Sequence, residues 1–225
     1  MNYPTRPLFF KLLIGFLTLF ASFSVLADLS DMSRIFRQTP SLNNFEVCYG
    51  GGCAEVKPVA LTSEEWQKVA AIFSHLDNSA VSAEQERKQI ATGIALLETI
   101  VGAKIGTSND LAGTFFEGHL SGQQDCNDEA INTTTYMRLM RQNGLVRQHE
   151  IEDTRTRNFF FTGWPHSTAV IRETKTSERF AVDSWFYDNG EPPVIVPFKQ
   201  WKSGYRPADS PVDNRKAAQV NSSAN

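Results

Sequence analysis

Cysteines, histidines and glycine-rich binding loops are scarce in this 225-residue chain, which contains three cysteines and four histidines. Cys48 and Cys53 lack a second Cys or His pair at the usual ligand spacing, which argues against a structural zinc site. The glycine run at 50–52 does not open a helix, so it is neither a phosphate-binding loop nor a dinucleotide fingerprint. The sequence therefore gives no sign of zinc, nucleotide or dinucleotide binding.

An excess of positive charge is also absent. Lys and Arg total 22 against 25 Asp and Glu, which gives a formal net charge of −3 with neutral histidines. A mildly acidic protein is not expected to have nucleic acid or an anionic membrane surface as its main partner.

The one long apolar run lies at the N-terminus, where Arg6 and Lys11 precede an apolar stretch at 12–20. Small residues occupy the −3 and −1 positions before a cleavage site at Ala27, so residues 1–27 are predicted to be a signal peptide of a periplasmic or secreted protein. An uncleaved anchor is the alternative, although the run is short for a membrane span. The residue directly after Ala27 is Asp28 and not a cysteine, so no lipoprotein attachment site is expected there.

Cleavage would leave 198 residues, with 20 basic residues against 25 acidic ones and a net charge of −5. This length is enough to bury one core, and residues 28–205 are predicted to form a single domain with no integral membrane span. Residues 206–225 are polar and alanine-rich without an apolar period, so we predict a disordered tail.

Three cysteines in an exported protein leave one thiol without a partner. Cys48 and Cys53 enclose Tyr-Gly-Gly-Gly, a loop flexible enough to close a disulfide, and Cys126 would then remain free. Two alternatives stay open, because sequence does not determine connectivity: Cys126 pairs with one of the others, or Cys48 and Cys53 remain reduced.

Helices are predicted to precede strands along the chain. Capping boxes at 62–65 and 82–85 open helices that run to about 77 and 104, and a third helix begins at Cys126 and ends before Gly144. Residues 28–61 read as irregular. The predicted strands are 145–152, 159–161, 166–172, 179–186 and 194–198. This order predicts an α+β fold with an antiparallel sheet.

The third helix places a cysteine at its first turn. Ala130, Thr134, Met137 and Met140 recur at helical spacing and predict one buried face. A thiol at a helix N-terminus faces unpaired N–H groups and the positive end of the helix dipole, both of which favour the thiolate. Cys126 is therefore the candidate nucleophile.

A cysteine nucleophile needs a base, which is usually an imidazole oriented by a third polar group. His166 begins a predicted strand, and a hairpin centred near Lys175 would place it opposite a residue within one or two of Asp183. Asp183 lies among apolar residues, where an unpaired charge is costly. The other histidines are less suited, since His75 and His149 read as surface residues and His119 lies in a loop.

The segment Asp-Cys-Asn-Asp-Glu-Ala at 125–130 resembles the nucleophile motif of bacterial transglutaminase-like cysteine peptidases. His166 followed by Ala-Val-Ile, and Val-Asp-Ser around Asp183, resemble the histidine and aspartate strands of that superfamily in the same order. The resemblance implies a papain-like fold with the nucleophile helix packed on an antiparallel sheet. It also implies a Cys126, His166 and Asp183 triad that acts on amide bonds as a peptidase, amidase or transglutaminase.

The resemblance also implies an oxyanion-stabilising glutamine upstream of the cysteine, for which Gln123 and Gln124 are candidates and Gln124 is preferred. A peptide or protein in the cell envelope would be the substrate, and no cofactor is required. Some relatives bind calcium beside the nucleophile, and Asp125, Asn127 and Asp128 offer suitable oxygens, although solvated acids at a helix start are commoner.

Two other interpretations remain. In the first, the chain is a non-catalytic envelope module. Its loop at 105–123 and aromatic residues such as Trp164 and Trp185 would hold a peptide or glycan. In the second, Cys126 is a buried core residue and its motif arises by chance.

Overall fold

The computed structural model describes residues 39–74, 81–115, 121–157 and 165–212. The predicted signal peptide, the predicted strand at 159–161, and His75, His119 and Trp164 lie outside these ranges. None of the helices within the described ranges is long and apolar enough to cross a membrane.

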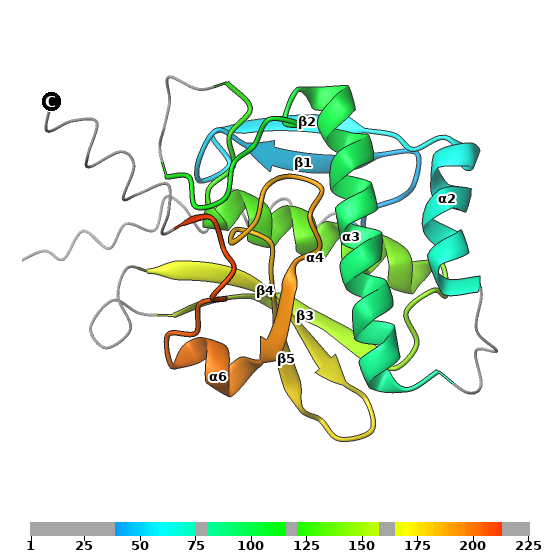
Figure 1. The fold of residues 1–225 in the computed structure, drawn as a ribbon. Coiled ribbons are helices and arrows are strands. Elements are labelled where there is room, and N and C mark those ends of the chain that lie inside the picture. The colour runs from blue at the N-terminus through cyan, green and yellow to red at the C-terminus, as the bar shows by residue number, and fades with distance from the viewer. Residues whose placement is uncertain (1–38, 75–80, 116–120, 158–164, 213–225) are drawn as a thin grey trace, which may run out of the picture.

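The described elements comprise helices and antiparallel strands, which confirms the α+β class (Figure 1). In chain order they are β1 (Phe45–Tyr49), β2 (Glu55–Val59), α2 (Ser63–Ser74), α3 (Ala83–Ile105), α4 (Cys126–Gln142), β3 (His149–Arg157), β4 (His166–Glu173), β5 (Arg179–Asp183), β6 (Val194–Pro197) and α6 (Phe198–Lys202). The predicted capping boxes at Thr62 and Ser82 are both formed, so the helices begin where the sequence predicted.

Strands β3 to β6 form one antiparallel sheet in sequence order, and α4 packs against it. Side chains alternate between the two faces of a strand. Ala169 and Ile171 of β4 and Phe180 and Val182 of β5 belong to the main apolar core, together with residues of α3 and α4. The opposite face of β4 and β5 carries His166 and Asp183 and meets α6 through Trp201.

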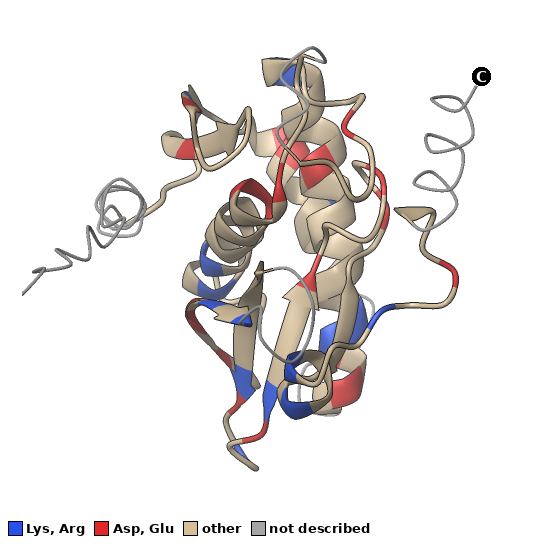
Figure 2. Cartoon of the chain, turned by 90° about the vertical axis from the view of Figure 1, so that its left-hand side faces the viewer, with Lys and Arg blue, Asp and Glu red and all other residues tan. Residues whose placement is uncertain are grey.

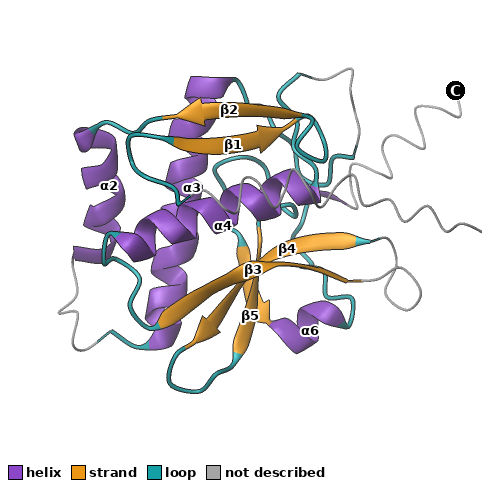
Figure 3. Cartoon of the chain, turned by 180° about the vertical axis from the view of Figure 1, so that it is seen from behind, coloured by secondary structure: helices purple, strands orange, loops and turns teal. Residues whose placement is uncertain are grey.

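Helix α4 lies between the sheet and the β1–β2 hairpin, as the view from behind shows (Figure 3). The sequence predicted one buried face, but the structure buries all its residues except Asn127 and Arg138 and its last residues. Because neighbours cover the helix on several sides, its polar residues need partners inside the protein. Thr134 bonds to the carbonyl of Ala130, and Thr133 contacts the Ser184 hydroxyl at 2.9 Å.

Residues 45–59 correct the prediction of an irregular segment at 28–61. They form the hairpin β1–β2, which is closed by the Cys48–Cys53 disulfide. Residues 48–53, hereafter the disulfide loop, connect the two strands. The glycines suggested irregular chain, but they serve the turn between strands whose apolar side chains, such as Phe45 and Val47, enter the core.

The predicted tail also begins later than expected. Val212 is buried beside Cys126 and Trp185, and the Ser210 hydroxyl donates to the carbonyl of Phe186. Residues 206–212 therefore belong to the folded part of the chain, because Pro207, Ser210 and Val212 are buried in it, while 213–225 lie outside the described ranges.

His149 is buried, which overturns its assignment to the surface. Its Nδ1 lies 2.7 Å from Oε1 of Glu86, and its Nε2 lies 3.2 Å from a guanidinium nitrogen of Arg87. Both partners come from the first turns of α3, so this histidine connects β3 to α3. It belongs to the framework of the fold and not to the candidate site.

Two glycines with left-handed backbone allow a matched test of packing. Gly122 (φ 80°) and Gly144 (φ 74°) both lie where a side chain is strained, but a Cβ at Gly122 would be 2.1 Å from the Gly106 carbonyl oxygen, whereas one at Gly144 meets nothing within 4 Å. Gly144→Ala should lower the free energy of unfolding by about 1 kcal/mol. Gly122→Ala should cost at least about 3 kcal/mol, because overpacking adds to the backbone strain. Urea denaturation measures both, and equal losses would contradict the close approach of residues 122 and 106.

Candidate active site

Cys126 is the first residue of α4 and the free cysteine of the chain. Asp125 is the N-cap, and its carboxylate accepts the backbone N–H groups of Asn127 and Asp128. The Cys126 side chain is 5% exposed and belongs to a small apolar cluster. Its sulfur accepts the backbone N–H of Ser167, the residue that follows His166. The nucleophile candidate is therefore held against the start of β4.

Burial raises the pKa of the Cys126 thiol to about 12. The N–H of Ser167 opposes this shift, while the carboxylates of Asp125, Asp183 and Asp128 add to it. The prediction of a stabilised thiolate is therefore wrong for this structure, because desolvation and three nearby negative charges outweigh the helix dipole. Cys126 is a thiol at neutral pH, so any reaction at its sulfur requires a base.

His166 and Asp183 form a buried pair. Nε2 of His166 lies 2.7 Å from Oδ2 of Asp183, and the two side chains are 4% and 1% exposed. The Nε1–H of Trp201 donates to the same carboxylate oxygen at 2.6 Å. The rings of Trp185 and Trp201 lie 4.7 Å and 5.8 Å from the imidazole. Asp183 thus fixes the orientation of His166 inside an aromatic surround.

The second ring nitrogen of His166 has no hydrogen-bond partner among the described residues, although it is buried. In a neutral imidazole whose Nε2–H donates to the Asp183 carboxylate, Nδ1 carries the lone pair. An unpaired buried acceptor is uncommon in folded proteins and asks for an explanation. This nitrogen is the candidate base of the site.

The register of β4 and β5 is close to the one predicted. Ala169 pairs with Val182 and Val170 with Ala181, so the same register extended along the chain places position 166 opposite position 185. That position is two residues from Asp183, within the predicted interval. Positions 166 and 183 consequently share one face of the sheet as diagonal neighbours, which allows their side chains to meet.

Arg157 is a residue of this region that the sequence did not reveal. It is the register partner of His166 in β3, and its guanidinium lies over the Trp201 ring and donates to the carbonyls of Trp201 and Tyr205. Burial lowers its pKa, and the nearby Asp183 carboxylate opposes that shift. Arg157 therefore fixes the segment that supplies the Trp201 hydrogen bond.

The two glutamines before Cys126 link the preceding loop to the rest of the domain. The Gln124 amide nitrogen donates to Asp110 at 3.3 Å and its oxygen accepts from Asn132 at 2.5 Å. The Gln123 amide bonds to backbone groups of Asn109 and Leu111. Both side chains are engaged in these structural contacts, so the structure gives no support to the predicted oxyanion role of Gln124.

The residues suggested for calcium use their oxygens in other ways. Both oxygens of Asp125 and both of Asp128 accept backbone N–H groups, and the Asn127 side-chain oxygen accepts the Ser167 hydroxyl at 2.7 Å. A calcium ion would have to replace these donors, because hydrogen-bond donors and cations compete for the same lone pairs. This donor set does not fit a calcium site.

A second feature that the sequence analysis missed is a buried acidic cluster beside α4, formed by Glu98, Asp110 and Glu129. Desolvation raises the pKa of Glu98 to about 8 and that of Asp110 to about 6, and it raises that of Glu129 well above its usual range. Glu129 and Asp110 are hydrogen-bonded through their side chains, which requires a shared proton. Figure 2 shows several acidic positions on neighbouring helices in the upper half of the view, whereas most Lys and Arg positions lie in the lower half, where further acidic positions are interspersed.

The position of Glu98 in the sequence could have indicated this buried acidic cluster. Glu98 lies four residues after Ile94 and three before Val101, on the apolar face of α3, where a glutamate is expensive unless neutral or paired. Its carboxylate accepts the backbone N–H of Gly190 at 3.1 Å, which connects α3 to the turn after β5.

Comparisons with known proteins give no relative for this arrangement. No protein-family model, no curated protein and no solved structure matches the chain. The resemblance to transglutaminase-like peptidases therefore stays a prediction from the sequence motifs.

The acidic cluster predicts a specific pH dependence of stability. The folded-state pKa of Glu98, about 8, exceeds its usual value of 4.5, so its neutral form stabilises the fold below pH 4.5 and this contribution is lost as pH rises through 8. Glu98→Gln removes the ionisation, and the stability of the variant relative to the natural protein should rise between about pH 5 and pH 8, by at most about 1.4 kcal/mol per pH unit.

Urea denaturation at several pH values measures this difference. Thr99→Val, a neutral change at the next position of α3, should shift stability equally at every pH. A Glu98→Gln difference that stays constant with pH would contradict the raised pKa.

Proposed function

We propose that this protein is a cysteine hydrolase or acyl-transferase with a papain-like, transglutaminase-like fold, which acts on amide bonds of peptides or proteins in the cell envelope. Cys126 is the nucleophile, His166 the base and Asp183 the residue that orients the base. The observation that carries the proposal is the buried hydrogen bond between His166 and Asp183. The second nitrogen of the imidazole has no hydrogen-bond partner among the described residues. The next residue in the strand, Ser167, donates its backbone N–H to the Cys126 sulfur.

The resting thiol determines the order of the chemical steps. Because the pKa of Cys126 is raised to about 12, His166 Nδ1 takes the thiol proton as the sulfur attacks the amide carbonyl. The imidazolium then gives this proton to the leaving amine, and the acyl group remains on sulfur as a thioester. Water or a second amine then attacks the thioester while His166 removes the proton of the attacking group. The C–S bond breaks, and the imidazolium returns this proton to the departing Cys126 sulfur.

Asp183 stabilises the imidazolium that forms in both steps. Its carboxylate is held by Trp201 as well as by His166, so it is prepared for the positive charge without rearrangement. The aromatic rings around His166 limit the access of water, which strengthens the electrostatic attraction between the imidazolium and Asp183.

The arrangement of elements also supports the proposal. The nucleophile candidate begins a helix that packs on an antiparallel sheet, and the histidine and aspartate candidates come from adjacent strands of that sheet. This is the order and placement that the sequence resemblance implies.

Alkylation of Cys126 by iodoacetamide tests the proposed base. The rate in the natural protein at neutral pH should fall about a hundredfold in His166→Ala, because proton transfer to the imidazole is lost, and less in Asp183→Asn. Mass spectrometry of the peptide that contains Cys126 gives the rate, and Lys175→Ala, at the hairpin tip, is the matched control. A natural protein no more reactive than a free thiol, with a rate unaltered in His166→Ala, would exclude activation.

A non-catalytic envelope module with the same fold is the second candidate. It is favoured by the low exposure of Cys126 and His166, 5% and 3%, and by the raised thiol pKa. Cavities of about 330, 410 and 570 Å³ within the described ranges are lined by other residues. Under this alternative Cys126→Ser leaves partner binding and the cellular phenotype intact, whereas the catalytic proposal requires the phenotype to be lost.

A further inference from the structure

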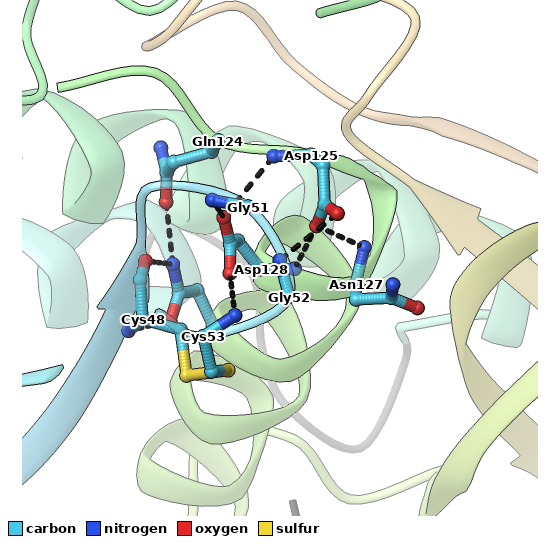
Figure 4. Close-up of a disulfide and its surroundings, with 9 residues drawn as sticks. Cys48, Gly51, Gly52, Cys53, Gln124, Asp125, Asn127 and Asp128 are labelled. Carbon is cyan, nitrogen blue, oxygen red and sulfur yellow. Dashed lines mark hydrogen bonds between the residues drawn. A yellow bond between two sulfur atoms is a disulfide. The ribbon is translucent and has the colours of Figure 1, made fainter. Parts of the chain in front are cut away.

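The disulfide loop lies over the N-terminus of α4 and is fastened there by its backbone (Figure 4). Asp128 accepts the N–H of Gly51 at 2.7 Å and that of Cys53 at 2.5 Å, one on each carboxylate oxygen. Asp125 accepts the N–H of Gly52 at 2.9 Å. Three consecutive amides of the loop therefore converge on the two carboxylates that flank Cys126.

The first strand of the hairpin is fastened one turn further along α4. The Asn132 side-chain oxygen accepts the N–H of Cys48, and its nitrogen donates to the carbonyl of Cys48, both at 2.8 Å. The N–H of Gly50 donates to the carbonyl of Gln123. The loop consequently contacts both the helix and the chain that leads into it.

The same two carboxylates hold the start of the helix. One oxygen of Asp125 caps the N–H groups of Asn127 and Asp128, and Asp128 returns a bond to the N–H of Asp125. Each carboxylate thus joins the disulfide loop to the helix turn that carries Cys126. A change in the loop changes the donors around both charges, and these charges already act on the thiol.

The converging amides require an unusual backbone. Gly50, Gly51, Gly52 and Cys53 all have positive φ values, 86°, 87°, 58° and 57°. Three glycines give the open chain many conformations, so an uncrosslinked loop would lose much of its conformational freedom to adopt this one. The disulfide restricts these alternatives and keeps the amides in place.

We propose that the disulfide loop is a redox-sensitive clamp, in which Asp128 is a positioning residue for Cys126 and reduction of the Cys48–Cys53 bond by a dithiol reductant lowers the reactivity of Cys126. This regulation rests on the proposed function. Releasing the loop removes N–H donors from two carboxylates beside the sulfur. The first turn of α4, which carries Cys126, is then less firmly placed against the start of β4 and His166.

The reduction is an ordinary thiol–disulfide exchange. A thiolate of the reductant attacks the sulfur of Cys53, which belongs to the more exposed of the two residues, and Cys48 leaves as a thiolate and takes up a proton. The second thiol of the reductant attacks the mixed disulfide and releases Cys53. Two electrons pass to the protein disulfide, and the reductant leaves as its own disulfide.

The experiment uses the full chain, either oxidised or treated with dithiothreitol and desalted. Iodoacetamide alkylation of Cys126 at neutral pH is followed by mass spectrometry. We expect the rate to fall at least about tenfold on reduction and to recover on reoxidation, since small displacements of a nucleophile cost large factors in rate. Cys48→Ser/Cys53→Ser should be slow and insensitive to dithiothreitol. A rate that is unchanged or higher after reduction overturns the proposal.

Asp128→Asn separates positioning from general stability. In the oxidised chain this variant should react more slowly than the natural protein, although it removes a negative charge near the sulfur, because the loop anchor is lost. Reduction should slow the variant no further, because both changes break the same contact. Glu55→Gln alters the hydrogen bond from Tyr49 to Glu55 within the hairpin, and this bond does not involve α4. This variant should retain the full redox response. If Asp128→Asn and reduction each slow alkylation and their effects multiply, the clamp is rejected. If circular dichroism shows that the reduced chain is unfolded, the rate of the oxidised Asp128→Asn variant decides, and a rate equal to that of the natural protein rejects the clamp.

His166→Ala distinguishes failure of the proposed function from failure of the clamp. If it leaves the rate of the oxidised protein unaltered, the proposed function fails. If it slows Cys126 but reduction does not, the function stands and the clamp alone is wrong.

Discussion

The fold depends on burying a polar helix terminus. Helix α4 begins with Asp125, Cys126 and Asp128, all of them buried, in a position covered by the disulfide loop and the start of β4. Helix N-terminal amides and buried carboxylates each need partners, and here they satisfy one another together with the amides of the loop. The two-stranded hairpin is therefore a structural complement to the helix start as much as a part of the core.

This solution has a consequence for the thiol. The carboxylates that satisfy the backbone also surround the sulfur with negative charge, and desolvation acts in the same direction. A thiolate favoured by the helix dipole alone is thus replaced by a protonated thiol. Positive charge is nevertheless near, because Arg157 is buried close to Asp183 and would interact favourably with Cys126 once its sulfur is ionised. The proposed function therefore requires proton transfer to His166 and not a preformed ion pair.

Local signals in the sequence predicted a large part of the fold. Capping boxes identified the starts of α2 and α3, and the spacing of apolar residues with the motif at 125–130 placed α4, because capping and periodicity involve neighbours in the chain. The hairpin β4–β5 was predicted from its strands and its polar tip, which brought His166 and Asp183 together. The Cys48–Cys53 bridge followed from its short glycine loop.

What the sequence did not reveal depends on partners far along the chain. His149 is buried because Glu86 accepts its hydrogen bond, and Asp183 is shared with Trp201 because Arg157 holds that segment in place. Glu98 is the informative intermediate case. A glutamate on the apolar face of a helix indicates that its carboxyl group is either paired or protonated. Only the structure shows that Asp110 and Glu129 lie close to it.

The acidic cluster and the candidate triad are connected through one short segment. Ser184, which follows Asp183, bonds to Glu98 and contacts Thr133 of α4, so the end of β5 is held between the cluster and the nucleophile helix. The raised pKa of Glu98 favours its neutral form, so Ser184 is held in this position without a fully buried charge beside it. The placement of Asp183 therefore depends on the protonation of the cluster through Ser184, and a change at Glu98 is expected to act on the end of β5.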